Sequence, residues 1–211
     1  MSIRDRLFAA VFDKVMAPME EAGLAAWRAE VMADLAGTVV DIGSGTGANL
    51  AHVPPTVDRL ILTDPSAPML EHLRARLDEV PDGVDVEVVR APATSLPLGD
   101  GEADAVTSML VLCSVPDVQA VLAEVRRVLK PGGTFAFIEH VAADDKPDRL
   151  RWQRRADHVW PHVAGGCRLT RRTGDDIAAA GFEVDDLTRE SARKAFPLVR
   201  TMIRGRAISA T

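Results

Sequence analysis

The sequence predicts an α/β protein with a doubly wound, mostly parallel sheet of seven strands, as in Rossmann-like folds. Between residues 38 and 140, short apolar segments alternate with amphipathic helical patterns, which is typical of strand–helix–strand units. The first apolar segment runs directly into a glycine-rich turn at 43–47. A length of 211 residues with 47% hydrophobic residues suits one domain with a sizeable core. We therefore expect a single domain over 1–211.

The individual elements follow from apolar runs and their boundaries. The predicted strands are 39–42, 59–63, 85–90, 105–112, 134–139, one that starts at Phe182, and one around 198–208. Helices are expected after Ser66, from Asp117, and near 174–180. The segment Lys130-Pro131-Gly132-Gly133 should end the second of these helices, because proline and glycine do not continue a helix.

The N-terminal residues 1–36 predict a helical lid. Apolar residues recur there at helical spacing in two runs, with a break expected at Pro18. Such a pair of helices packs over a cleft or lies on a membrane surface. The mixed charge of the polar face favours packing.

A second irregular region, 142–170, interrupts the alternation of strands and helices after Glu139. It contains Trp152, Trp160, two histidines and Cys167. Loops beyond the carboxyl ends of parallel strands carry function, so we expect this insertion to be a substrate cap. The two tryptophans either line an acceptor pocket or hold the cap in place.

Composition excludes several classes of function. The net charge of −6 and pI of about 5.4 do not predict a basic surface that would bind nucleic acid. No run of 18 uncharged apolar residues spans a membrane, and the first residues lack a secretory signal. Two cysteines make a disulfide framework implausible and indicate a reducing compartment. We expect a cytoplasmic protein, with peripheral membrane contact left open and no prediction of its oligomeric state.

The glycine turn predicts a nucleotide-type ligand site, followed by a helix whose free N–H groups face the ligand. Gly43, Gly45 and Ala48 also fit the dinucleotide pattern G-x-G-x-x-A, so a nicotinamide enzyme stays open at this point. Asp41, two residues before the first glycine, favours a ligand with an ammonium group. Asp64 closes the second strand, where it can accept ribose hydroxyls in either case.

Two further segments decide between these classes, namely 96–104 (LPLGDGEAD) and 127–133 (RVLKPGG). They resemble the segments that precede the fourth and fifth strands in class I S-adenosylmethionine-dependent methyltransferases. The resemblance covers about residues 36–140 and implies S-adenosylmethionine as cofactor. The family's adenine-binding acid is missing here, so the backbone N–H of Ala93 would serve instead. The implied donor-binding residues are Asp41, Gly43, Gly45, Gly47, Asp64, Pro65, Ala93 and Leu110.

The acceptor side is indicated by the segments 110–115, 139–142 and 152–171. In this order they resemble the methyltransferase-like thiol S-methyltransferases, which implies a small thiol or sulfide as acceptor. The alternatives are a small oxygen or carbon nucleophile (quinone, phenol or lipid headgroup), a non-catalytic donor-binding module, or an oxidoreductase.

His140, just past the fifth strand, is the candidate base, and Asp157 and His158 are candidates for orienting the acceptor. Each has a structural interpretation as well, as a backbone-bonded histidine or a cap residue. Cys113 and Cys167 are expected to be packing residues. No metal site is predicted, because Pro161 separates His158 from His162 and no third ligand accompanies them.

Overall fold

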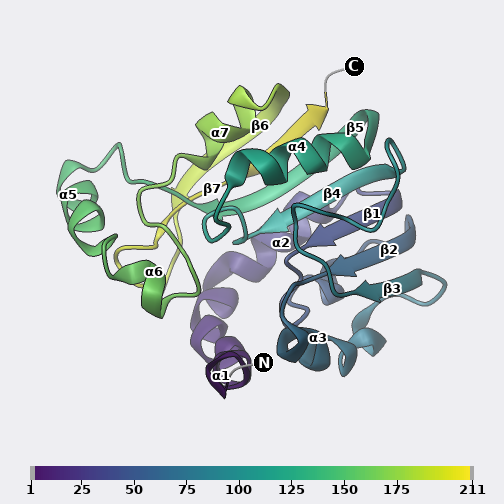
Figure 1. Ribbon diagram of the computed structural model, residues 1–211, viewed down its shortest axis with the longest axis horizontal. Coiled ribbons are helices and arrows are strands. Elements are labelled where there is room, and N and C mark those ends of the chain that lie inside the picture. Colours follow the sequence, from purple (N-terminus) through teal and green to yellow (C-terminus); the bar gives the residue numbers. More distant parts are fainter. Residues whose placement is uncertain (1–2, 210–211) are drawn as a thin grey trace.

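The structure is a computed structural model that describes residues 3–209, with side chains from residue 9 onward. Within this range, seven strands form one sheet in the order β3-β2-β1-β4-β5-β7-β6 (Figure 1). All pairs from β3 to β5 are parallel, and β7 is antiparallel to both neighbours. The predicted mostly parallel sheet is therefore confirmed. The strands are β1 (Gly37–Ile42), β2 (Val57–Thr63), β3 (Asp85–Val89), β4 (Ala103–Met109), β5 (Leu129–His140), β6 (Phe182–Ser191) and β7 (Thr201–Ser209).

Both faces of the sheet are buried, as expected for parallel strands between helices. Consecutive residues of β1 show this, since Val39 belongs to the apolar cluster on one face and Val40 to the cluster on the other. Helices α2 (Ala25–Met32) and α3 (Ala67–Arg74) contribute to the first cluster. Helices α4 (Val118–Val128) and α7 (Thr173–Ala179) cover the opposite face (Figure 1). Asp117 caps α4 by accepting the Ala120 N–H at 3.0 Å.

The N-terminal helices differ from the prediction in where they bend. Helix α1 (Ile3–Met19) includes Pro18, and a π-helical segment (Glu20–Leu24) follows it. The chain changes direction at Gly23, whose φ of 139° is accessible to glycine but strained for other residues. The expected break at Pro18 is therefore wrong by five residues, because the proline lies within α1 and Gly23 supplies the bend.

The region after the glycine turn also differs from the prediction. Turns lead from Gly43 only to a 3-10 segment, Leu50–His52, where an α-helix was expected. Asn49 explains the difference, because its side chain donates to Asp41 on β1 and accepts from Arg28 on α2. These bonds hold the loop against the sheet in a non-helical path. The fourth strand ends at Met109 rather than at residue 112, since Leu110 has a left-handed backbone (φ 65°).

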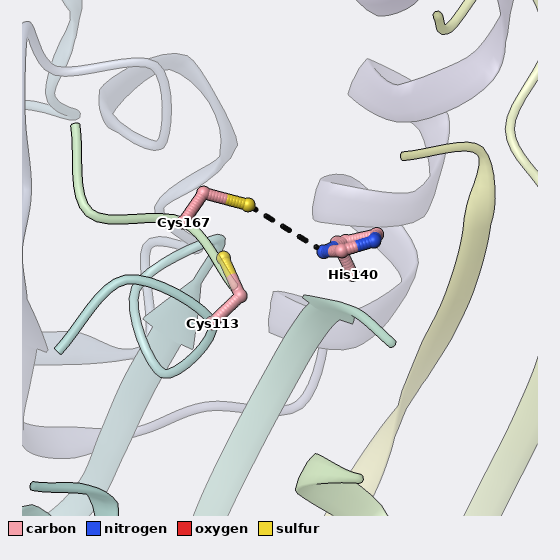
Figure 2. A group of neighbouring side chains, drawn as sticks. All are labelled: Cys113, His140 and Cys167. Carbon is pink, nitrogen blue, oxygen red and sulfur yellow. Dashed lines mark hydrogen bonds between the residues drawn. The ribbon is translucent and has the colours of Figure 1, made fainter. Parts of the chain in front are cut away.

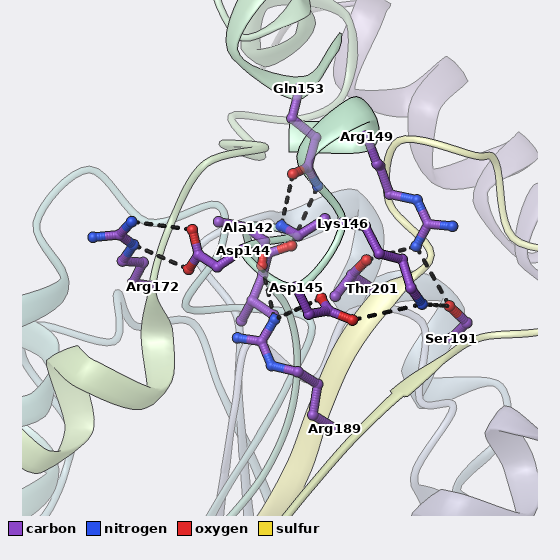
Figure 3. A network of polar contacts seen from close by, with 12 residues as sticks. Ala142, Asp144, Asp145, Lys146, Arg149, Gln153, Arg172, Arg189, Ser191 and Thr201 are labelled. Carbon is purple, nitrogen blue, oxygen red and sulfur yellow. Dashed lines mark hydrogen bonds and ion pairs between the residues drawn. The ribbon is translucent and has the colours of Figure 1, made fainter. Parts of the chain in front are cut away.

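Residues 142–170 form two short helices, α5 (Pro147–Ala156) and α6 (Trp160–Val163), at one end of the sheet (Figure 1). Figure 3 shows how side chains fasten this region. Buried Gln153 accepts the Ala143 N–H at 2.8 Å and donates to the Leu198 carbonyl at 2.8 Å. Arg172 pairs with Asp144, and Arg149 donates to Thr201. Within residues 3–209, every helix is too short or too polar to cross a bilayer.

Candidate active site

The glycine turn lies at the carboxyl end of β1, beside the turn that follows β4. An added Cβ at Gly43 would stand 2.6 Å from the Val111 side chain, so this glycine permits close packing of the two turns. Gly45 differs, since its added Cβ would meet nothing closer than 3.9 Å. With a φ of +56°, Gly45 presents bare backbone to open space. Gly45 is thus the glycine of the turn where a ligand can approach the chain.

Asp41 is 1% exposed, and its two oxygens have different surroundings. Oδ1 accepts from Asn49 Nδ2 at 2.8 Å and from Thr107 Oγ1 at 2.5 Å. Oδ2 has no partner among the described residues. Burial raises the pKa of Asp41, and the bonds from Thr107 and Asn49 oppose this rise. A buried carboxylate oxygen without a donor is costly, so this atom fits the ammonium group of S-adenosylmethionine.

Asp64 follows β2 and binds the glycine turn directly. Its Oδ2 accepts the Gly45 N–H at 3.1 Å, and its Oδ1 accepts the Ser66 N–H at 2.7 Å. Burial raises the pKa of Asp64 while these two bonds lower it. Each oxygen retains a lone pair for a ribose hydroxyl. The spacing between Asp64 and the turn is therefore fixed before any ligand binds.

The remaining predicted donor residues occupy the same edge of the sheet. Pro65 is exposed, and its carbonyl accepts from Arg90 at 2.9 Å. Ala93 is half-buried beyond β3, and Leu110 is half-buried beyond β4. Gly47 has a packing role, since its added Cβ would stand 2.7 Å from the Leu50 side chain.

The turn after β4 is organised by Glu139, which the sequence analysis did not assign to the site. Its buried carboxylate accepts from Ser108 Oγ at 2.8 Å and from the backbone N–H groups of Val111, Leu112 and Cys113 at 2.9–3.1 Å. Burial raises the pKa of Glu139, and these bonds oppose the rise. An acidic residue at the end of an otherwise apolar strand was the available signal, because buried carboxylates need several donors.

His140 ends β5 and meets both cysteines of the chain, as Figure 2 shows. Its Nδ1 lies 3.6 Å from Cys167 Sγ, and the ligand atoms of Cys113, His140 and Cys167 all lie within 4.8 Å of one another. The imidazole is 2% exposed, and Nε2 has no partner among the described residues. The hydrogen bond between the two thiol groups, followed by burial, raises the pKa of Cys113 well above its usual value. The same hydrogen bond lowers the pKa of Cys167.

Asp157 and His158 do not join this group. Asp157 accepts the Leu169 N–H at 2.5 Å and the Thr170 hydroxyl at 2.8 Å, so both oxygens fix the loop that carries Cys167. His158 is exposed. Both residues therefore suit a structural role in the cap rather than contact with an acceptor. Trp152 is 61% exposed, so the cap tryptophans do not form a joint pocket wall.

The sheet order, the glycine turn on β1 and the acids on β1 and β2 define an S-adenosylmethionine-dependent methyltransferase of class I. A family model described as "Methyltransferase domain" matches residues 40–137. Two human enzymes, thiol S-methyltransferases TMT1B and TMT1A, are each 36% identical to the chain, and each match covers 81% of this chain and 70% of the relative. The chain therefore belongs to the family of these thiol S-methyltransferases.

The solved structures agree on the fold. An S-adenosylmethionine-dependent methyltransferase from Thermotoga maritima superposes with a TM-score of 0.69 at 22% identity, covering 97% of each chain. The family model and the relatives of 36% identity confirm the predicted class of enzyme, so the alternatives of a nicotinamide oxidoreductase and of a non-catalytic module are set aside.

Proposed function

We propose that this methyltransferase acts on the sulfur of a small thiol and releases a thioether and S-adenosylhomocysteine. The observation that carries the proposal is the group of Cys113, His140 and partly buried Cys167 beside the turn that reaches the donor site. Polarisable sulfur atoms and an imidazole suit a sulfur acceptor. The names of the human relatives, which are 36% identical, point to the same acceptor class.

On the donor side, the proposed roles follow from the atoms that are free to bind. Asp41 Oδ2 accepts the ammonium group, Asp64 accepts the ribose hydroxyls, and the bare backbone at Gly45 lies against the donor. The backbone N–H of Ala93 receives the adenine. Pro65, Leu110, Gly43 and Gly47 shape the walls of the pocket. The sulfonium supplies an activated methyl group, so these residues contribute alignment and exclusion of water.

On the acceptor side, we propose His140 as the residue that activates the thiol. A free thiol is only a few per cent ionised at neutral pH, and the thiolate is the nucleophile. His140 is a buried imidazole at the carboxyl edge of the sheet, next to the turn that links the donor and acceptor sides. We propose structural roles for Asp157 and His158 instead of catalytic ones, because Asp157 binds the loop that carries Cys167 and His158 is exposed.

Two segments would enclose the acceptor. The N-terminal helices, within 1–36, cross the glycine turn, where Asp13 Oδ1 accepts from Thr46 Oγ1 at 2.5 Å. The 142–170 cap approaches from the other side through Cys167. We propose a lid and a cap in these positions, a cytoplasmic location, a small-molecule acceptor and no nucleic-acid partner.

A turnover panel tests the acceptor class. Small alkyl thiols and phenols are offered with S-adenosylmethionine, and S-adenosylhomocysteine release is measured. We expect turnover of thiols, and a fall of at least about 100-fold for His140→Gln, since activation of a nucleophile contributes about 10²–10⁴-fold. His158→Gln replaces an exposed histidine in the cap, is the matched control and should keep full activity. Turnover of phenols alone would make the thiol assignment wrong.

A further inference from the structure

The three atoms of the cysteine–histidine group are spaced as the ligands of a tetrahedral metal ion would be. Zinc binds Cys sulfur at about 2.3 Å and His nitrogen at about 2.0 Å, which places sulfur and nitrogen about 3.6 Å apart and two sulfurs about 3.8 Å apart. The distance from Cys167 Sγ to His140 Nδ1 is 3.6 Å, and all three ligand atoms lie within 4.8 Å of one another. Any separation above the ideal values would have to close by rotation of a cysteine side chain when the ion binds.

Backbone contacts hold the three ligand-bearing segments together without any ion. The Arg168 N–H donates to the Cys113 carbonyl at 2.8 Å, which places the residue beside Cys167 against the turn after β4. The Ala142 N–H donates to the Arg171 carbonyl at 2.8 Å and fastens the end of β5 to the same loop. Gly166 permits this crossing, since its φ is +91° and an added Cβ would stand 2.8 Å from the Ser114 carbonyl oxygen. The arrangement is therefore preorganised, as ligand sites require.

We propose that Cys113, His140 and Cys167 bind one Zn²⁺ through Sγ, Nδ1 and Sγ, and that the fourth position receives the sulfur of the acceptor thiol. Two thiolates neutralise the ion, which suits a buried site. A set of two cysteines and one histidine with an open position is a known catalytic zinc geometry. Cys167 is only partly buried, so the ion has access from that side.

This inference rests on the proposed thiol acceptor and gives His140 the role of a ligand. The thiol binds the ion as thiolate, and its proton leaves to solvent. The sulfur lone pair then forms a bond to the methyl carbon as the bond from that carbon to the donor sulfur breaks. The sulfonium charge disappears with this step. The products are a neutral thioether, which is a weaker ligand and departs, and S-adenosylhomocysteine.

The test measures metal binding first, because that readout does not depend on turnover. The full chain is purified under reducing conditions, stripped with a chelator, and titrated with Zn²⁺ or with Co²⁺ as a coloured substitute. We expect about one ion per chain and the thiolate-to-cobalt charge-transfer absorption of a tetrahedral site. Cys113→Ser, Cys167→Ser and His140→Gln should each weaken binding strongly, whereas His158→Gln should not. Heat of S-adenosylhomocysteine binding verifies that each variant is folded.

The outcomes separate the two proposals. Loss of thiol turnover on stripping, with recovery on adding Zn²⁺, supports the zinc site and its open position. Full thiol turnover by the metal-free chain, or metal binding that survives both cysteine substitutions, overturns the zinc inference and leaves the thiol assignment standing. A disulfide between the two cysteines that persists in the active enzyme under reducing conditions would overturn it as well. Stoichiometric zinc at these residues, with methylation of phenols alone, refutes the acceptor and the role of the fourth position.

Discussion

Replacing Glu139 with alanine should destabilise the protein strongly, because one carboxylate holds the whole turn after β4. The substitution leaves the Ser108 hydroxyl and three backbone N–H groups, those of Val111, Leu112 and Cys113, without their acceptor. Each buried polar group without a partner costs about 1–3 kcal/mol. Water entering the vacated volume recovers part of this cost, so we expect a loss of about 3–5 kcal/mol in the free energy of unfolding.

Glu139→Gln is the informative companion variant. The amide oxygen can replace Oε1, which accepts from Ser108, Val111 and Leu112. In the native protein Oε2 accepts the Cys113 N–H at 3.1 Å. In the variant the amide nitrogen takes the place of Oε2, so two donors face each other there. The expected loss is about 1–2 kcal/mol, that of one broken bond. Glu71→Ala, an exposed glutamate on α3, should change stability by less than about 0.5 kcal/mol.

Urea unfolding followed by circular dichroism measures all three variants, and the slope with denaturant verifies two-state behaviour. An acceptor that serves several donors predicts the largest loss in the free energy of unfolding for Glu139→Ala, a smaller loss for Glu139→Gln and the smallest for Glu71→Ala. Equal losses for alanine and glutamine would show that charge, rather than hydrogen bonding, matters at this position. A loss below about 1 kcal/mol for alanine would refute the role of Glu139 as organiser of the turn.

The further predictions concern the donor site and the cap. Gly45 and Gly101 have similar φ values of +56° and +65°, and both have open space where an alanine methyl group would stand. Gly45→Ala and Gly101→Ala should therefore each cost about 1 kcal/mol of stability. Only Gly45→Ala should weaken S-adenosylhomocysteine binding in calorimetry. Burial raises the pKa of Asp41 above 3.8, so donor binding should weaken as the pH falls through the raised value, with a weaker and flatter profile for Asp41→Asn. The folded chain holds that proton more tightly, so stability should fall as the pH rises above 3.8, and Asp41→Asn should remove this slope in urea unfolding. Asp157→Ala should lower the free energy of unfolding by about 1–3 kcal/mol and leave the calorimetric donor affinity unchanged; weakened donor binding would contradict its role in the cap.

The fold was predictable because its determinants are local. Apolar runs of strand length, such as 39–42 and 134–139, lie within the observed β1 and β5, and the glycine turn follows β1 as expected. The misplaced break at Pro18 has a local cause in Gly23, whereas the error after the glycine turn occurs where distant residues decide the backbone. The loop after Gly47 avoids an α-helix because Asn49 is bound by Asp41 and by Arg28, which comes from another helix. Periodicity contains no information about such a contact.

The donor half of the proposed site was predictable from the sequence, whereas the acceptor half was not. Donor residues such as Asp41, Gly45 and Asp64 lie within one strand–turn–strand unit, so their spacing in the sequence predicts their grouping. The acceptor group combines Cys113, His140 and Cys167, which lie 27 residues apart in sequence at each step. Their meeting depends on the path of the cap loop past the turn after β4. Only the tertiary structure provides that path.

In the proposed site the turn 110–113 would belong to both the donor half and the acceptor half, which would couple donor binding to acceptor binding mechanically. Leu110 begins the turn on the proposed donor side, and Cys113 ends it on the proposed acceptor side. Glu139 accepts the N–H groups of Val111, Leu112 and Cys113. Glu139 and His140 are adjacent on β5, so the residue that shapes the turn is anchored beside the residue that meets the cysteines. A displacement of the turn therefore changes the donor wall and the position of Cys113 together. This is why a substitution at Glu139 should affect both ligands, whereas one at Asp157, which fixes the loop that carries Cys167, should affect the acceptor side alone.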